Sequence, residues 1–250
     1  MGPDYSIIIP AYNEAKRLAP TLDKVLSFAR AQRWKFEVIV VNDGSRDNTA
    51  DIVATYSRSN SQVRLIENPG NRGKGYAVKN GMLNARGRIL LMSDADLSSP
   101  IEEASKLFDA IERGADVAIG SRWLDPSTQT VRQPWYRQLF GRVFNMLIRV
   151  ILGLGQKDTQ CGFKAFTRSS AQLLFRMQRI ERWGFDPELL FLSHRFHLTV
   201  REVAVEWAHD PASKIRPFRD AFNILSDVIQ VRRNAWARRY SAPLTSAATA

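Results

Sequence analysis

Short apolar runs rich in Ile and Val alternate with helix-like segments through the first half of this chain. The runs that indicate strands are 5–10, 36–41, 63–66, 88–92 and 116–120, and the segments that indicate helices are 13–33, 49–57, 75–85 and 100–113. Strands and helices alternating at such short spacing predict a mostly parallel α/β sheet with right-handed crossovers. Ligands of such sheets bind beyond the carboxyl ends of the strands, so the residues after each run are the first candidates for a site.

Two carboxylates follow the run at 88–92. Asp94 and Asp96 stand one residue apart, before a Ser-Ser-Pro segment that opens a helix. Aspartates this close repel each other unless a cation lies between them. Oxygen-only ligands suit a hard ion such as Mg²⁺ or Mn²⁺, which takes further oxygens from water or substrate phosphates. The pattern predicts a metal-diphosphate site, although by itself it fits a helix cap or a turn at least as well.

The other strand ends carry turn and loop residues. Asn13 is the expected N-cap of the first helix, and the Asn-Asp-Gly-Ser segment at 42–45 is expected to be a turn held by its own side chains. Segment 70–75 is rich in glycine and contains Lys74, but it matches neither the Rossmann fingerprint nor the Walker loop. It is expected to be a flexible cationic loop, which beside a strand end could also cover a phosphate or a base.

Composition excludes several classes of protein. Of 250 residues 44% are hydrophobic and 24% charged, so the chain can bury a sizeable core and is not disordered. The single Cys161 excludes a disulfide framework and a cysteine-based zinc site, and it fits a reducing compartment. The first residues do not show the pattern of a signal peptide. A net charge of +11 favours an anionic partner, whether nucleic acid, a lipid surface or a phosphorylated small molecule.

The second half contains two amphipathic segments. Between 139 and 152 the polar residues form one narrow helical stripe, made of Gln138, Arg142, Asn145 and Arg149. The apolar stretch is too short to span a bilayer, so this helix is expected either in the core or in a membrane interface. Segment 213–240 combines an apolar helical face with many basic residues, which fits either an anionic membrane or a solvated basic face. Between the two, 158–166 is expected to be a loop entering a short strand, 182–191 a helix capped by Asp186, and 199–207 a strand.

Taken in order, the motifs resemble those of the family 2 glycosyltransferases with the GT-A fold. They are Pro-Ala-Tyr-Asn-Glu at 10–14, Asn-Asp-Gly-Ser-Arg-Asp at 42–47, Asn-Arg-Gly-Lys-Gly at 71–75, Asp-Ala-Asp at 94–96 and Gly-Ser-Arg at 120–122. Segments 158–164 and 213–220 look most like dolichyl-phosphate β-glucosyltransferases and their bacterial relatives, with dolichyl-phosphate mannose synthases next. The resemblance covers about residues 5 to 235. It implies a GT-A, Rossmann-like mixed sheet flanked by helices, with amphipathic helices at the C-terminal end.

The same resemblance implies a division of the chain and roles for particular residues. One domain is expected over 1–240, with a nucleotide half at 5–122, an acceptor half at 123–240 and a disordered tail at 241–250. The expected nucleotide-sugar contacts are Pro10, Ala11, Tyr12, Glu14, Asp43, Lys74, Asp94 and Ala95. The expected metal ligands are Asp96 and Asp94 with Ser98, the expected phosphate-binding residues are Arg122, Arg142 and Lys214, and the expected catalytic carboxylates are Asp94, Asp96 and Asp158. Two positions depart from the family pattern: Asn42 replaces a frequent aspartate, and Ser98 replaces a metal-holding glutamine of mannose synthases, which favours the glucosyl branch.

The implied activity is inverting transfer of a hexose, with glucose from UDP-glucose favoured, to a polyprenyl or dolichyl phosphate. It would require Mg²⁺ or Mn²⁺ and would take place at the cytoplasmic face of a membrane to which the protein binds peripherally. A lipid phosphate is already ionised near neutral pH, whereas a sugar hydroxyl would need a carboxylate base, for which Asp158, Asp186 and Glu188 are the candidates.

Alternative functions are mannosyl transfer from GDP-mannose, transfer to a sugar hydroxyl, and nucleotide-sugar binding without turnover. A nucleic-acid-binding module would also explain the positive charge. However, the basic residues cluster late in the chain and lack interleaved aromatic residues, so nucleic acid is not an expected partner.

Overall fold

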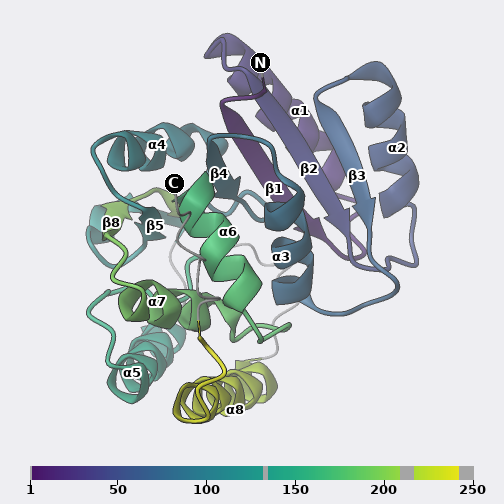
Figure 1. The fold of residues 1–250 in the computed structure, drawn as a ribbon. Helices are drawn as coiled ribbons and strands as arrows, with labels where there is room; N and C mark the ends of the chain where they lie inside the picture. Colours follow the sequence, from purple (N-terminus) through teal and green to yellow (C-terminus); the bar gives the residue numbers. More distant parts are fainter. Residues whose placement is uncertain (1, 132–134, 209–216, 242–250) are drawn as a thin grey trace, which may run out of the picture.

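The part of the chain that this computed structural model describes, residues 2–131, 135–208 and 217–241, contains a seven-stranded sheet in the order β3-β2-β1-β4-β7-β5-β8 (Figure 1). Its strands are β1 (Tyr5–Ala11), β2 (Phe36–Asn42), β3 (Val63–Glu67), β4 (Ile89–Met92), β5 (Val117–Ser121), β7 (Lys164–Thr167) and β8 (Val200–Ala204). A separate pair joins β6 (Gln129–Val131) to β9 (Trp207–Ala208). The helices are α1 (Leu18–Ala31), α2 (Thr49–Ser59), α3 (Lys74–Asn84), α4 (Ala104–Glu112), α5 (Trp135–Leu152), α6 (Arg168–Met177), α7 (Phe185–Arg195) and α8 (Pro217–Trp236), with 3₁₀ turns at Ile101–Glu103 and Pro126–Thr128.

Strand direction in this sheet brings distant loops to one edge. β1 runs parallel to β2 and to β4, β2 runs parallel to β3, and β5 runs parallel to β8. β7 alone is antiparallel, and Lys164 at its start pairs with Met92 at the end of β4. The predicted mixed, mostly parallel sheet is confirmed. Because β7 is reversed, the loop that precedes it arrives at the carboxyl edge, where β1, β2 and β4 end.

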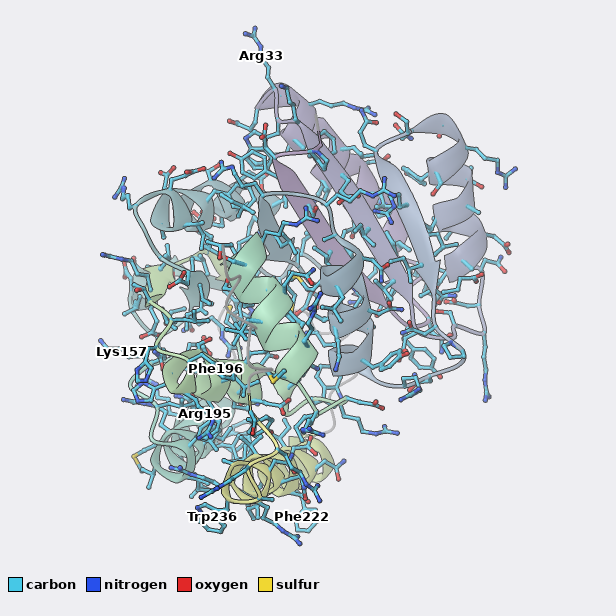
Figure 2. All side chains as sticks on the ribbon, in the orientation of Figure 1. Arg33, Lys157, Arg195, Phe196, Phe222 and Trp236 are labelled. Atoms are coloured by element: carbon cyan, nitrogen blue, oxygen red, sulfur yellow. The ribbon has the colours of Figure 1, made fainter. Side chains whose placement is uncertain are left out.

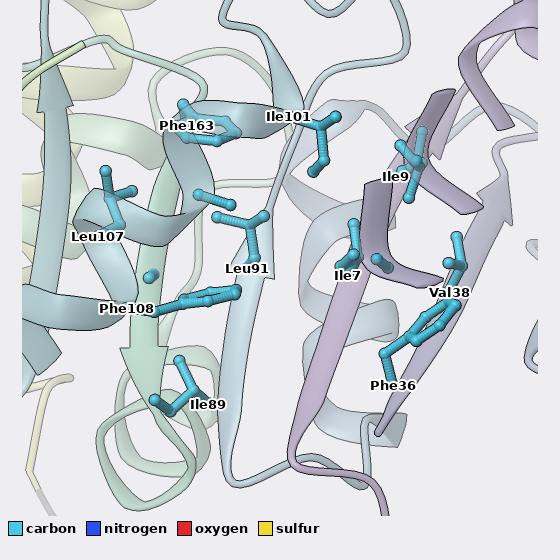
Figure 3. Packing of buried hydrophobic residues seen from close by; sticks show 14 of the residues in the cluster. Ile7, Ile9, Phe36, Val38, Ile89, Leu91, Ile101, Leu107, Phe108 and Phe163 are labelled. Atoms are coloured by element: carbon cyan, nitrogen blue, oxygen red, sulfur yellow. The ribbon is translucent and has the colours of Figure 1, made fainter. Parts of the chain in front are cut away.

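Alternating strand residues serve two cores, one on each face of the sheet. Ile7 and Ile9 of β1 face a cluster that includes side chains of α1, α2 and α4, part of which is shown in Figure 3. Ile8 faces the opposite cluster, built with side chains of α3, α6 and α7. Period-two alternation that buries both faces is expected of a sheet covered by helices on both sides, which is the arrangement in Figure 1. The polar ends of the strands are therefore left at the rims.

Most expected elements are present, but several local predictions are wrong. Asn13 does not cap α1, which begins at Leu18 without a side-chain cap; Asn13 instead has a φ of 53° and bonds a neighbouring loop. Asp186 does not cap α7, because Gly184 occupies that position. The expected helix from 100 begins as a 3₁₀ turn, the strand expected over 199–207 is divided into β8 and β9, and α6 was not predicted.

Helix α5 leaves much of its apolar surface exposed. Asn145 of the polar stripe is buried, together with Ile148 and Leu152. The residues left exposed are mostly large and apolar: Tyr136, Leu139, Phe140, Val143, Met146, Leu147 and Val150. The expectation that this helix lies in the core is therefore wrong for its apolar face. Within the described ranges, no helix has the length and hydropathy needed to cross a membrane.

Both halves of the expected domain contribute to the same sheet, since β7 and β8 come from beyond residue 122. The division into a nucleotide half and an acceptor half stays a prediction. The segment 213–216, with Lys214, and nearly all of the expected disordered tail lie outside the described residues.

Candidate active site

The carboxyl edge of the sheet collects the polar residues that follow four strands. Asp43 follows β2 and donates its N–H to the carbonyl of Ala11 at the end of β1 (2.8 Å). Ser93 follows β4 and donates its N–H to the carbonyl of Ile8 on β1 (3.0 Å). These backbone bonds extend the sheet by one residue and fix the places from which Asp43 and Asp94 project. Arg122 follows β5, two strands away from β4.

Asp94 is paired with a cation from the glycine-rich loop. Lys74, the first residue of α3, places its Nζ 2.5 Å from Asp94 Oδ1. Burial alone would lower the pKa of Lys74, but the negative charges of Asp94 and Asp186 outweigh burial and raise that pKa. The lysine therefore carries its positive charge at neutral pH. The structure brings together Lys74 and Asp94, which the sequence assigned to the same nucleotide-sugar contact.

Asp96 stands at a tight turn beside Asp94. Leu97 has a φ of 48°, and the N–H of Ser98 donates to Asp96 Oδ1 (2.9 Å). Burial, followed by the negative charge of Asp94, raises the pKa of Asp96. Arg17 Nη1 lies at 4.0 Å from Asp96 Oδ2. Ser98 thus lies beside Asp96, and its role as a metal ligand stays a prediction.

The donor set at this turn fits a hard divalent cation. Two carboxylates one residue apart destabilise each other's charge, and a bound cation would relieve this repulsion. Mg²⁺ and Mn²⁺ accept one or two carboxylates, with substrate phosphate and water completing the shell. No group of three or more His, Cys, Asp or Glu suited to a metal is found among the described residues. A cation here would accordingly need oxygens from a ligand as well as from Asp94 and Asp96.

Asp43 organises the glycine-rich loop. Its Oδ1 accepts from Asn68 Nδ2 (2.8 Å) and from the N–H of Arg72 (3.1 Å), and its Oδ2 accepts from the N–H of Gly73 (2.7 Å). Gly44, with a φ of 70°, lies so close that a Cβ on it would meet Gly70 at 2.5 Å. The 70–75 segment is therefore held in place by hydrogen bonds to Asp43 and by the close approach of Gly44 to Gly70. The expected contact of Asp43 with an N–H of a base stays a prediction.

The remaining expected nucleotide contacts border the same edge. Ala11 and Ala95 are buried, and the carbonyl of Ala95 accepts from Thr21 Oγ1 (2.7 Å), which ties this turn to α1. The N–H of Glu14 donates to Thr49 Oγ1 (2.8 Å). Pro10 and Tyr12 are half-buried beside them. Their contact with a nucleotide stays a prediction.

Arg122 and Asp158 form a two-pronged ion pair. Asp158 Oδ2 accepts from the Nε and the backbone N–H of Arg122 (2.7 and 3.1 Å), and Oδ1 accepts from Arg122 Nη2 (2.8 Å) and from the N–H of Gln160 (3.2 Å). Burial alone would raise the pKa of Asp158, but the charge and hydrogen bonds of Arg122 outweigh burial and lower it. Four bonds fill the four acceptor positions of a carboxylate. This geometry gives Asp158 the role of orienting Arg122.

Two tryptophans surround the arginines on the acceptor side. The guanidinium of Arg122 lies 5.4 Å from the ring centroid of Trp207, and those of Arg122 and Arg142 lie 5.8 and 5.2 Å from that of Trp123. Trp123 therefore brings the arginine after β5 and the arginine on α5 to one ring, and their binding of phosphate stays a prediction. Lys214, the third expected cation, lies outside the described residues.

The two other candidate bases are buried and bonded. Asp186 Oδ1 lies 2.5 Å from Lys164 Nζ. Glu188 Oε1 accepts from Tyr240 Oη (2.6 Å) and from the N–H of Arg179 (3.0 Å), and its Oε2 accepts from the N–H of Ile180 (2.9 Å). Burial raises the pKa of Glu188. Both carboxylates are engaged, Asp186 in an ion pair through Oδ1 and Glu188 in three hydrogen bonds.

Three residues of the site were missed from sequence. Gly162 presses its backbone against the Asp94 carboxylate, so that a Cβ there would overlap Asp94 Oδ2. Lys164 is fully buried beneath this contact, and Trp183 places its ring centroid 5.4 Å from Lys74 Nζ. The glycine in the Cys161-Gly162-Phe163 segment was the available signal. Cys161 itself is not a reactive thiol, because burial and the charge of Asp158 raise its pKa to about 11.

Known proteins share this fold and much of this sequence. Dolichyl-phosphate beta-glucosyltransferases of Drosophila melanogaster and Homo sapiens are 38% and 34% identical to the chain, over 94% and 91% of its length and 75% and 74% of theirs. A relative of the same name from Trichomonas vaginalis is 38% identical over 94% of the chain and 76% of its own length.

Solved structures at lower identity have the same architecture. Glucosyl-3-phosphoglycerate synthase from Mycobacterium tuberculosis in complex with UDP has a TM-score of 0.66 at 20% identity, over 98% of this chain and 82% of that chain. Its complex with Mn²⁺, UDP-glucose and glycerol 3-phosphate has a TM-score of 0.63 at 18% identity, with the same coverage. These likenesses confirm the predicted GT-A fold. Residues 6–175 match the model of glycosyl transferase family 2, and with relatives of this identity the chain belongs to that family.

Proposed function

We propose that this glycosyltransferase transfers glucose from UDP-glucose to the phosphate of a polyprenyl or dolichyl lipid. The relatives named above are dolichyl-phosphate beta-glucosyltransferases, and the structural neighbour binds UDP, UDP-glucose and Mn²⁺. Ser98, in place of the metal-holding glutamine of the mannose synthases, supports glucosyl over mannosyl transfer.

One observation carries the choice of acceptor: each of the three candidate bases is already engaged in an ion pair or in hydrogen bonds. Asp158 is filled by Arg122, Asp186 is paired with Lys164, and Glu188 is bonded to Tyr240 and two backbone N–H groups. Transfer to a sugar hydroxyl needs a base that removes the hydroxyl proton. A phosphate monoester, with a second pKa of about 6, is mostly ionised at neutral pH and needs none. The arrangement therefore favours a lipid phosphate.

The donor end of the site is assigned to Asp94, Asp96 and Lys74. Asp94 and Asp96 would hold the divalent cation, which when bound would stabilise the charge that develops on the leaving diphosphate. Lys74 would contact the same diphosphate, and Pro10, Ala11, Tyr12, Glu14, Asp43 and Ala95 would border the base, the ribose and the sugar.

The acceptor end is assigned to Arg122 and Arg142, with Lys214 as a third cation. Asp158 orients the Arg122 guanidinium with two parallel bonds, so its remaining donors are held in a fixed direction. The acceptor oxygen would attack the anomeric carbon from the side opposite the diphosphate. This inverts the configuration and gives a β-linked lipid phosphate sugar from an α-linked donor.

The surface formed by α5 and α8 is assigned to the membrane, at its cytoplasmic face. The two helices pack side by side (Figure 1), and Arg232 Nε of α8 donates to the carbonyl of Ile151 on α5 (2.5 Å). We call their exposed apolar residues the α5–α8 face: the seven residues of α5 named above with Phe222, Ile229 and Trp236 of α8. Arginines flank this face, and apolar side chains beside basic ones are typical of helices that lie in an anionic membrane surface.

The decisive experiment is a panel of radiolabelled donors with a short polyprenyl phosphate, with and without Mn²⁺. UDP-glucose is expected to give a β-linked, lipid-extractable product, and UDP-GlcNAc and GDP-mannose are expected to give much less. Asp96→Asn should abolish the dependence on Mn²⁺ together with most turnover. Product from GDP-mannose alone, an α-linkage, or transfer only to a sugar hydroxyl would each contradict the proposal.

A further inference from the structure

Lys164 is a fully buried lysine directly beneath the donor end of the site. It is the first residue of β7 and pairs in register with Met92 of β4 and Ile119 of β5, which places it in the middle of the sheet. Its ammonium contacts the carbonyl of Cys161 and lies 2.5 Å from Asp186 Oδ1. Burying two charges requires strong mutual compensation, and such a pair usually adds little net stability over apolar residues of the same volume.

The contacts of Lys164 lead back to Asp94 by two routes. Through Cys161, Lys164 holds the backbone just before Gly162, whose Cα rests against the Asp94 carboxylate. Through Asp186, it is coupled to Lys74, because the charge of Asp186 acts on Lys74 as well.

Together these groups form a closed series of alternating charge. Asp94 is paired with Lys74, Asp186 is paired with Lys164 and acts on Lys74 through its charge, and the Cys161–Gly162 backbone closes the series. We call this series the charge ring. Only Asp94 and Lys74 in it are expected to touch the donor.

We propose that Lys164 is a positioning residue, which, together with Asp186, sets Asp94 and Lys74 in the geometry that binds the donor diphosphate. The inference rests on the proposed function of this site. In the ring, Asp186 contacts Lys164 and also acts on Lys74 through its charge. Without Lys164, the charge of Asp186 would lose its contact partner, and the backbone beside Gly162 would lose its anchor.

A double replacement separates positioning from stability. Lys164→Met or Asp186→Leu alone leaves an unmatched buried charge, so each is expected to lower the Tm. The double variant Lys164→Met/Asp186→Leu removes both charges and is expected to regain a Tm near that of the wild type. Its turnover, however, is expected to stay about 10²-fold low, the size of effect that a misplacement of about 1 Å can produce. Recovery of wild-type turnover together with Tm would show that the pair is only structural.

A second variant covers the case in which the double variant does not fold. Asp186→Asn keeps the shape and an oxygen for Lys164 but removes the charge shared with Lys74. Its affinity for UDP in the presence of Mn²⁺, measured by calorimetry, is expected to fall at least about tenfold. Its circular dichroism spectrum at 25 °C is expected to be unchanged, although the unmatched charge of Lys164 lowers its Tm. UDP affinity and turnover both within twofold of the wild type would overturn the proposal. A wild type that binds UDP but transfers no glucose would count against the proposed function and not against the charge ring.

Discussion

The backbone of Gly162 lies against the carboxylate of Asp94, in the position that any side chain at residue 162 would occupy. Gly162→Ala would place a Cβ on Asp94 Oδ2, so the aspartate would have to leave its place beside Lys74. Turnover is expected to fall by about 10²-fold, because the displaced carboxylate is the one proposed to hold the cation and the donor. Steady-state rates with UDP-glucose measure this change. Gly155→Ala is the matched control, since a Cβ there meets nothing within 4 Å, and equal losses in the two variants would contradict this reading of Gly162.

Asp158 is expected to orient the Arg122 guanidinium and not to serve as a general base that accepts a proton. Asp158→Asn would remove the charge that matches Arg122, and the free energy of unfolding is expected to fall by about 3 kcal/mol, the lower end for a broken buried pair because Arg122 keeps some contact with solvent. Acceptor kcat/KM should fall strongly while the shape of the pH–rate profile is unchanged. Loss of the acidic limb of that profile would identify Asp158 as a base. Asp125→Asn, an exposed cap of a 3₁₀ turn, is the control.

The same pair gives a pH dependence of stability. Because the folded pKa of Asp158 is lowered, its contribution is fully present above the ordinary aspartate pKa of about 3.9 and is lost as the pH falls through the folded value. The stability difference between wild type and Asp158→Asn should therefore be constant near neutral pH and shrink in acid. Urea denaturation of both proteins at several pH values tests this, and a difference that grows in acid would contradict it.

Tyr240 is expected to stabilise the fold through the charge on Glu188. Tyr240 is almost fully buried, and its hydroxyl donates to Glu188 Oε1 (2.6 Å). Tyr240→Phe removes this donor from a buried carboxylate, at an expected loss of about 1–3 kcal/mol. The folded pKa of Glu188 is already raised by burial, so stability falls as the pH rises from the ordinary glutamate pKa of about 4.3 through the folded value. Losing the hydroxyl should raise that pKa further.

The loss in Tyr240→Phe should consequently be larger at a pH above the folded pKa of Glu188 than at pH 4. Urea denaturation at the two pH values measures it. Equal losses at both would show that the hydroxyl acts without regard to the charge on Glu188.

Local patterns explain which parts of this molecule the sequence could predict. The β4 strand and the turn after β2 carry their own signals: an apolar run for the first, and for the second an Asn42 whose Oδ1 accepts from the N–H of Ser45 (3.1 Å). Asn13 could not be placed in this way, because its side chain accepts from the N–H of Arg46 in a distant loop (2.8 Å). Helix α6 did have a signal, since Thr167 caps it by accepting from the N–H of Ser170.

The sequence indicated which charged residues belong to the site, but it did not indicate which of them form ion pairs with each other. Asp94 and Lys74 were assigned to one site because the motifs that contain them resemble those of the family 2 glycosyltransferases. Two of the partnerships could not be predicted: the ion pair of Asp158 with Arg122 and that of Asp186 with Lys164. Both depend on the reversed direction of β7, which no local pattern indicates. The outward apolar face of α5 was likewise one of two open interpretations, since an amphipathic pattern does not say which side meets the protein.

The α5–α8 face is expected to bind anionic vesicles by a local patch and not by net charge alone. Arg33 lies at one end of the molecule, and Phe222 and Trp236 project at the opposite end from α8, which also carries the exposed Arg233 (Figure 2). Arg233→Glu and Arg33→Glu change the net charge equally. Near an anionic surface each basic residue contributes about 1 kcal/mol, so Arg233→Glu should weaken sedimentation with phosphatidylserine vesicles at least about tenfold, and Arg33→Glu should change it little.

An apolar test complements the charge test. Val150 is 73% exposed on α5, so Val150→Asp should leave the Tm unchanged while it prevents insertion into the vesicle surface. Wild-type binding should also weaken as salt is added, because surface charges are screened. Equal losses for Arg233→Glu and Arg33→Glu, or binding by Val150→Asp that matches the wild type, would show that this face is not the contact. The lipid phosphate would then have to reach Arg122 and Arg142 from another side of the molecule.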